Sequence, residues 1–146
     1  MIRIIDLDEA YAMVQAHGIY LDSAPQGLPC GADAMIVQLI NGFTAILLDE
    51  DLLETEAQLI VALVHELAHY LEGALYTVGA PPALIYKAEC KAERRQIQML
   101  LPFEELQEAV RSGYDTVYAL ADHFGLTEEF VHDAVDYYLG YCGKHF

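Results

Sequence analysis

The sequence has no tryptophan and few basic residues: seven Lys and Arg stand against 23 Asp and Glu, a formal net charge of −16. A surface of this sign repels a phosphate backbone, so we expect no direct contact with nucleic acid and a basic protein as partner. Cysteine is also scarce. Cys30, Cys90 and Cys142 lie far apart with no CxxC spacing, which predicts neither a disulfide framework nor a cysteine zinc site.

Long apolar runs are missing as well. No segment has the uninterrupted apolar length of a membrane span, and Met1–Glu9 meets acidic residues too early for a signal peptide. We therefore expect no membrane contact and a cytoplasmic location. A length of 146 residues with 55% hydrophobic composition predicts one well-packed domain.

Hydrophobic periodicity and turn signals predict a mostly helical α+β protein with a small antiparallel sheet. A first helix is expected over about Leu7–His17 and a short strand at 19–21. Asn41-Gly42 between the apolar runs 34–40 and 43–48 predicts a β-hairpin with a type I′ turn. A second helix is expected to begin after its N-cap residue Thr55 and to run to about Glu72. Four more helices are expected over about 83–101, 103–112, 116–124 and 128–139.

His65, Glu66 and His69 form an HExxH pattern inside the apolar helix that Thr55 and Gln58 begin with a capping box. Imidazoles four positions apart reach one ion, and Glu66, about 100° round from His65, holds a water beside it. The alternative is two satisfied core histidines on an ordinary buried helix. Because buried polar groups cost free energy unless satisfied, we favour Zn²⁺ on His65 and His69, with Glu66 as the general base.

A catalytic zinc site needs a third protein ligand. The metzincin pattern is excluded, because it requires glycine and histidine where this chain has Glu72 and Leu75. On the helix over 83–101, both Glu89 and Glu93 fall on the apolar side, where a carboxylate needs a metal or a basic partner. The projection leaves the choice between these two open. Glu72, one turn after His69, is predicted to accept a hydrogen bond from a ligand imidazole.

Two segments resemble the ImmA/IrrE family of metallopeptidases, found in prophages, mobile elements and bacterial stress regulators. They are residues 63–70, LVHELAHY, and residues 89–102, ECKAERRQIQMLLP, which is similar to the family's Glu-x-x-Ala-Asn block ending in Leu-(Leu/Ile)-Pro. The likeness covers most of the chain. It implies that His65, His69 and Glu89 bind the metal and that Glu66 is catalytic.

The resemblance also implies an organisation and a function. It predicts a zincin-like metallopeptidase domain over residues 1–113 and helix-turn-helix-like C-terminal helices over 114–146, packed on the same domain. The expected substrate is a specific regulator, such as a basic helix-turn-helix repressor of a prophage or mobile element. The last predicted helix contains Glu128, Glu129, Asp133 and Asp136 but no Lys or Arg, which favours protein docking or core packing over DNA binding.

Three positions depart from the family pattern: Glu93 where asparagine is usual, and Arg95 and Gln96 where an aromatic residue and alanine are more common. Glu93 adds an acid near the expected ion. This motivates a second hypothesis, a non-proteolytic metal-containing module that binds a transcription factor or an antitoxin-like partner. For the peptidase, Tyr70, Tyr76 and Tyr86 are the candidates that would stabilise an oxyanion.

Overall fold

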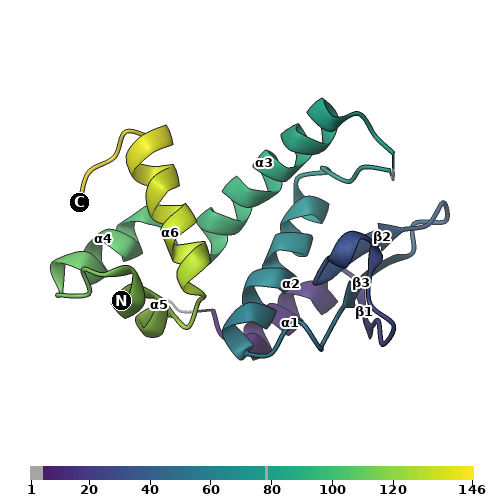
Figure 1. Ribbon diagram of the computed structural model, residues 1–146, viewed down its shortest axis with the longest axis horizontal. Coiled ribbons are helices and arrows are strands. Elements are labelled where there is room, and N and C mark those ends of the chain that lie inside the picture. The colour runs from purple at the N-terminus through teal and green to yellow at the C-terminus, as the bar shows by residue number, and fades with distance from the viewer. Residues whose placement is uncertain (1–4, 78) are drawn as a thin grey trace.

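The computed structural model describes residues 5–77 and 79–146 and confirms a mostly helical α+β fold (Figure 1). Residues 1–4, on which part of the signal-peptide prediction falls, and Val78 lie outside the described residues. The helices lie close to their predicted bounds. They are α1 (Leu7–Ala16), α2 (Glu56–Leu71), α3 (Pro82–Leu100), α4 (Phe103–Arg111), α5 (Val117–Phe124) and α6 (Glu128–Asp136), which continues into a π-helical turn at Tyr137–Tyr141.

The sheet consists of β1 (Tyr20–Ser23), β2 (Ala34–Gln38) and β3 (Thr44–Leu48) in the order β1-β3-β2. The predicted hairpin is present, since β2 and β3 pair antiparallel. The sheet as a whole is mixed and not antiparallel, because β1 pairs parallel to β3. A central strand needs hydrogen-bond partners on both sides, and no local sequence signal shows in which direction a distant strand will supply them.

The turn of the hairpin differs from the type I′ turn that Asn41-Gly42 predicts. Gly42 has a φ of 86°, but Cys30 is the only non-glycine residue with a positive φ among residues 5–77 and 79–146, so Asn41 lacks one. Gly42 N donates to Leu39 O at 2.9 Å and Leu39 N donates to Phe43 O at 2.8 Å. These bonds close a three-residue loop in which only the glycine takes the left-handed conformation.

One hydrophobic cluster joins the N-terminal elements to the C-terminal helices. It contains Ile46 of β3 and Leu63 of α2 together with Phe124 and Val131 of α5 and α6. Figure 1 shows α3 running from the part that contains α1, α2 and the sheet to the part that contains α4, α5 and α6. The boundary between residues 113 and 114 stays a prediction. In the part of the chain that the structure describes, no helix is both long enough and apolar enough to cross a bilayer.

Candidate metal centre

The α2 helix begins as its sequence predicts. Thr55 Oγ1 accepts a hydrogen bond from Gln58 N at 3.1 Å, and Gln58 Oε1 accepts one from Thr55 N at 3.0 Å, which confirms the capping box. Three turns later, His65 and His69 lie on one side of the helix with ring centroids 4.9 Å apart. The helical spacing alone therefore places the two imidazoles side by side.

Glu89 of α3 faces both imidazoles. Its Oε2 atom lies 3.0 Å from Nε2 of His65 and 3.2 Å from Nε2 of His69. The candidate ligand atoms of the three residues all lie within 4.8 Å of one another. His69 is almost fully buried, whereas the side chains of His65 and Glu89 are 28% and 39% exposed. The cluster is thus anchored in the core and open to solvent on one side.

The donor set and its spacing fit a zinc ion. Two imidazole nitrogens and a carboxylate oxygen are the ligands of many catalytic zinc sites, and metal–ligand bonds of about 2.0–2.1 Å in a tetrahedron place ligand atoms roughly 3.3 Å apart. The two distances between Glu89 Oε2 and the imidazole nitrogens, 3.0 and 3.2 Å, are within a few tenths of an ångström of that value. Since the candidate ligand atoms lie within 4.8 Å of one another, the three side chains would have to adjust their positions to surround the ion.

Each of the three side chains has a further partner that holds it in place. His69 Nδ1 lies 2.9 Å from the backbone oxygen of Ala74, just beyond the end of α2. Tyr76 donates a hydrogen bond from its hydroxyl to Oε1 of Glu89 at 2.7 Å. His65 Nδ1 lies 3.1 Å from Oε1 of Gln96, a buried residue of α3. Such outer partners are typical of metal-ligating side chains, whose ring orientation they set.

The same contacts decide the protonation of the cluster. Burial disfavours the charged form of His65, but its hydrogen bond to Glu89, helped by Glu66 and Gln96, outweighs burial and raises the pKa to about 9. The pKa of His69 is also raised, because hydrogen bonds to Glu89 and to the Ala74 carbonyl outweigh burial. Hydrogen bonds from the two histidines hold the pKa of Glu89 well below its usual range. Without metal, the raised pKa values favour the imidazolium forms of both histidines beside the Glu89 carboxylate.

Glu66, the predicted general base, follows His65 on α2 and is half-buried. Burial raises the pKa of its carboxyl above the ordinary value, although His65 and His69 oppose the change. A carboxylate with a raised pKa accepts a proton more readily and still returns it, as a general base near neutral pH must.

Two sequence expectations around the cluster are wrong. Glu93 does not face the core but is exposed, one helical turn from Glu89. Glu72 does not bind an imidazole; its Oε2 accepts a hydrogen bond from Arg95 at 2.9 Å, and the Ala74 carbonyl takes the expected place beside His69. Backbone carbonyls are available at every residue, so no side-chain pattern indicates which one a histidine will use.

Gln96 was not singled out as part of the site. The sequence does contain a signal for it. Gln96 follows Glu89 by seven positions, which is two helical turns, so the two side chains lie on the same face of α3. Of the three tyrosines considered, only Tyr76 contacts the cluster. Tyr86 is 73% exposed, and the ring of Tyr70 packs against His17 at 5.8 Å.

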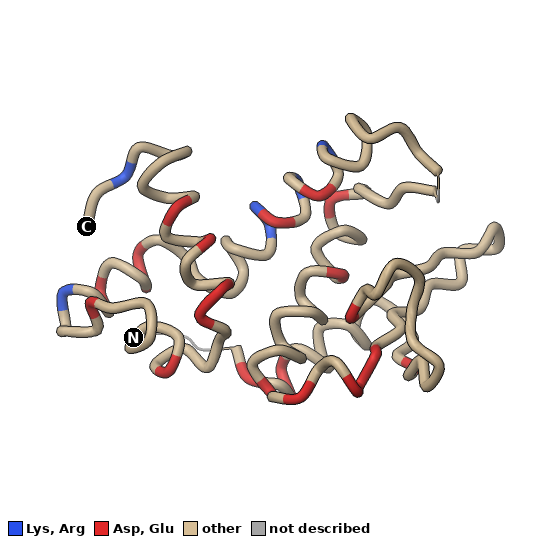
Figure 2. Tube along the Cα trace, in the orientation of Figure 1, with Lys and Arg blue, Asp and Glu red and all other residues tan. Residues whose placement is uncertain are grey.

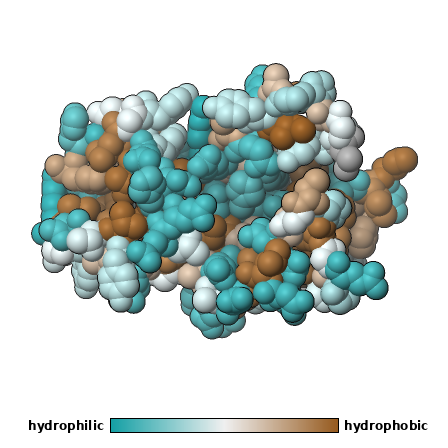
Figure 3. Space-filling view, in the orientation of Figure 1, coloured by the Kyte–Doolittle hydropathy of each residue, from teal (hydrophilic) through white to brown (hydrophobic). Residues whose placement is uncertain are grey.

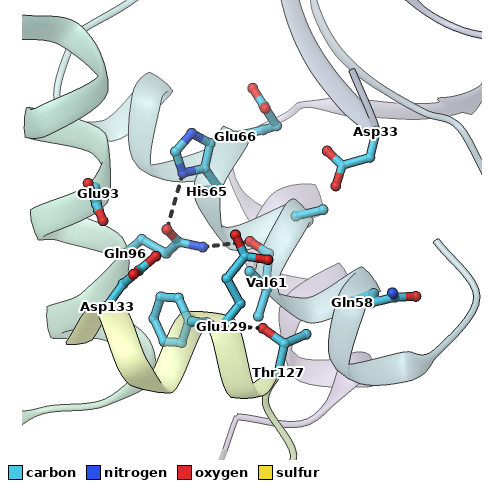
Figure 4. Close-up of a pocket in the computed structure, with 12 residues that line it drawn as sticks. Asp33, Gln58, Val61, His65, Glu66, Glu93, Gln96, Thr127, Glu129 and Asp133 are labelled. Atoms are coloured by element: carbon cyan, nitrogen blue, oxygen red, sulfur yellow. Dashed lines mark hydrogen bonds between the residues drawn. The ribbon is translucent and has the colours of Figure 1, made fainter. Parts of the chain in front are cut away.

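A cavity of about 400 Å³ adjoins the cluster, between α2, α3 and α6 (Figure 4). His65 and Glu66 line it together with carboxylates from three other parts of the fold. Figure 3 shows mainly hydrophilic side chains in the middle of this face of the molecule. The acidic side chains that line the cavity besides Glu66 are Asp33, Glu93, Glu129 and Asp133.

No protein-family model, curated protein or solved structure matches this chain. The resemblance to ImmA/IrrE metallopeptidases therefore depends on the two sequence segments that carry it and stays a prediction. The geometry of the cluster is independent of that resemblance, because it follows from the contacts between α2 and α3.

Proposed function

We propose that this protein is a zinc-dependent endopeptidase that cleaves a specific regulatory protein. The observation that carries the proposal is that His65, His69 and Glu89 meet from two helices and that each has an outer partner. A neutral core histidine without a metal role needs one hydrogen-bond acceptor, which Nδ1 of His65 and of His69 already has. Here the Glu89 carboxylate also faces the Nε2 atom of each ring. That arrangement is the one expected of ligands that exchange protons for a cation.

The proposed chemistry assigns a separate task to each residue. A zinc ion, when bound, would lower the pKa of a water molecule toward neutrality and polarise a peptide carbonyl. Glu66, adjacent to His65 and facing the cavity, accepts the proton from the attacking water and delivers it to the departing amine. Tyr76 is hydrogen-bonded to Glu89. We therefore propose that Tyr76 orients this ligand and does not stabilise the oxyanion.

The substrate that we propose is a basic protein segment. The cavity beside Glu66 is bordered by four further carboxylates, and among the described residues that line it none is Lys or Arg. The helices α2 and α6, which form two of its walls, contain no Lys or Arg, whereas the described Lys and Arg lie on α3, α4 and the C-terminal tail (Figure 2). A field of one sign in a concave site attracts cationic partners and repels a phosphate backbone.

The edge strand β2 offers an extended segment a place to bind. The order β1-β3-β2 leaves β2 with one edge facing away from the sheet, and Asp33, just before its first residue, lines the cavity. Main-chain groups of a substrate would pair with this edge while its basic side chains enter the cavity. Backbone pairing of this kind contributes affinity with modest selectivity, so the acidic cavity would supply the discrimination.

A Glu66→Gln variant tests the proposal. Wild-type and variant protein are purified for zinc analysis, and each is expressed in cells whose newly formed protein N-termini are identified by mass spectrometry. We expect about one zinc ion in both proteins, new N-termini with the wild type only, and loss of those N-termini in the variant. Glu108→Gln, at an exposed carboxyl of α4 that does not line the cavity, is the control that retains cleavage.

Two outcomes would count against the peptidase. Absence of zinc from the wild-type protein would contradict the metal site. Identical N-termini with wild type and Glu66→Gln, together with capture of the same intact partner by both, would contradict proteolysis and support the non-proteolytic binding module instead.

A further inference from the structure

Gln96 makes two side-chain hydrogen bonds that together determine its orientation. It is 3% exposed, its Nε2 donates to the backbone oxygen of Val61 at 2.7 Å, and its Oε1 lies 3.1 Å from Nδ1 of His65 (Figure 4). A backbone carbonyl can only accept, so the atom of the amide that faces Val61 must be the NH₂ group. The amide oxygen is therefore the atom that faces His65.

This orientation in turn determines the proton on His65. An amide oxygen only accepts hydrogen bonds, so Nδ1 of His65 must bear a hydrogen to make the contact. In a neutral imidazole with a proton on Nδ1, the lone pair is on Nε2. That nitrogen is the one that faces Glu89 and His69.

We infer that Gln96 is a positioning residue that holds His65 in its Nδ1–H form and so presents Nε2 to a divalent cation shared with His69 and Glu89; this inference rests on the proposed zinc site. The Ala74 backbone carbonyl serves His69 in the same way. For His65, the acceptor is a side chain from α3 and not a backbone carbonyl. The pairing also ties α3 to α2 at the point where the cluster forms.

The test compares zinc affinity in Gln96→Met and Gln98→Met by competition with a chelator. Methionine keeps nearly the volume of glutamine but removes both polar ends, and Gln98 is an exposed glutamine of the same helix. We expect Gln96→Met to weaken zinc binding by about 10- to 100-fold, the usual effect of removing an outer partner, and Gln98→Met to leave it unchanged. Equal affinity in wild type and Gln96→Met would overturn the inference while leaving the zinc site intact.

Gln96→Glu separates orientation from packing. A carboxylate still accepts from Nδ1–H of His65 but no longer donates to Val61, so we expect zinc affinity between those of wild type and Gln96→Met. If the Glu and Met variants weaken zinc binding equally, Gln96 acts through packing and the positioning role is wrong.

Spectroscopy of the zinc-loaded protein gives a readout that packing would not change. In the wild type, ¹⁵N–¹H spectra should show a slowly exchanging proton on Nδ1 of His65, and in Gln96→Met this proton should exchange rapidly. A proton on Nε2 in the wild type would overturn the inference. A wild-type protein that binds no zinc overturns it as well, together with the metal site of the proposed function.

Discussion

Tyr76 donates a hydrogen bond from its hydroxyl to Oε1 of Glu89 at 2.7 Å, which leaves Oε2 of the same carboxylate facing His65 and His69. This bond raises the pKa of Tyr76 from its ordinary value of 10 to about 12, so the hydroxyl keeps its proton well above neutral pH. Glu89 is thus oriented to offer one oxygen to the cluster and the other to Tyr76.

The first prediction follows from this contact. Tyr76→Phe should weaken zinc binding about tenfold, the lower end of the range for outer partners, because Tyr76 is partly exposed and water can replace its hydroxyl. Chelator competition measures the change. Tyr86→Phe, on the exposed surface of α3, is the control, and an equal loss in both variants would contradict a specific role for Tyr76.

The second prediction concerns the protons of the cluster. His65, with a pKa of about 9, holds two ring protons near neutral pH, and zinc must displace one of them; the pKa of His69 is shifted in the same direction. Binding should therefore release at least one proton per ion near pH 7, and the apparent affinity should rise as the pH increases toward about 9. Calorimetry in buffers of different ionisation enthalpy counts the protons. An affinity that is constant from pH 6 to pH 9 would show that the histidines are neutral beforehand.

The third prediction is the pH dependence of stability in the metal-free protein. The pKa of His65 is raised from 6.5 to about 9, so its contribution is complete below pH 6.5 and is lost as the pH rises through 9. The pKa of Glu89 is lowered from 4.5, so its contribution is complete above that value and is lost as the pH falls below it. The cluster should stabilise the fold most between about pH 4.5 and 6.5.

Thermal unfolding in the presence of a chelator from pH 3 to pH 10 measures this dependence. Glu89→Gln should flatten the profile and lower the pKa of His65. Burial favours the neutral imidazole, and without the Glu89 carboxylate fewer contacts favour the charged form. The exposed Glu93→Gln should leave the profile as it is. A wild-type profile already flat between pH 5 and pH 9 would show that the ion pairs do not form.

The fourth prediction concerns how the C-terminal helices attach to the rest of the fold. The buried hydroxyl of Tyr138 donates to the backbone oxygen of Leu101 at 2.8 Å, and its ring contacts Phe103 with centroids 5.4 Å apart. Tyr138→Phe should lower the free energy of unfolding by about 1–2 kcal/mol, because the carbonyl loses its buried partner. Chemical denaturation measures this value. Tyr118→Phe, at a 70% exposed position, should change it by less than about 0.5 kcal/mol.

Much of the secondary structure could be predicted because its signals are local. The capping box of Thr55 and Gln58, the apolar period of α2 and the glycine in the hairpin loop each act within a few residues of chain. The HExxH spacing belongs to the same class, since helical geometry alone makes His65 and His69 neighbours. Such features form wherever the segment folds into its own element.

Tertiary structure decided the features that depend on a second element. A helical projection shows that Glu89 and Glu93 share one side of α3. The position along α3 at which α2 packs determines that Glu89 contacts the histidines and that Glu93 is exposed to solvent. The parallel pairing of β1 with β3 and the contact of Gln96 with His65 are of the same kind.

The sequence by itself thus determined the helices, the hairpin and the two adjacent histidines, because hydrogen bonds and side-chain spacing within one segment are sufficient for them. Only the packing of α3 against α2 decided that Glu89 joins the two histidines and that the buried amide of Gln96 contacts His65. The physical reason is that a side chain's direction is set by its own helix, whereas the group it meets is set by where another helix passes.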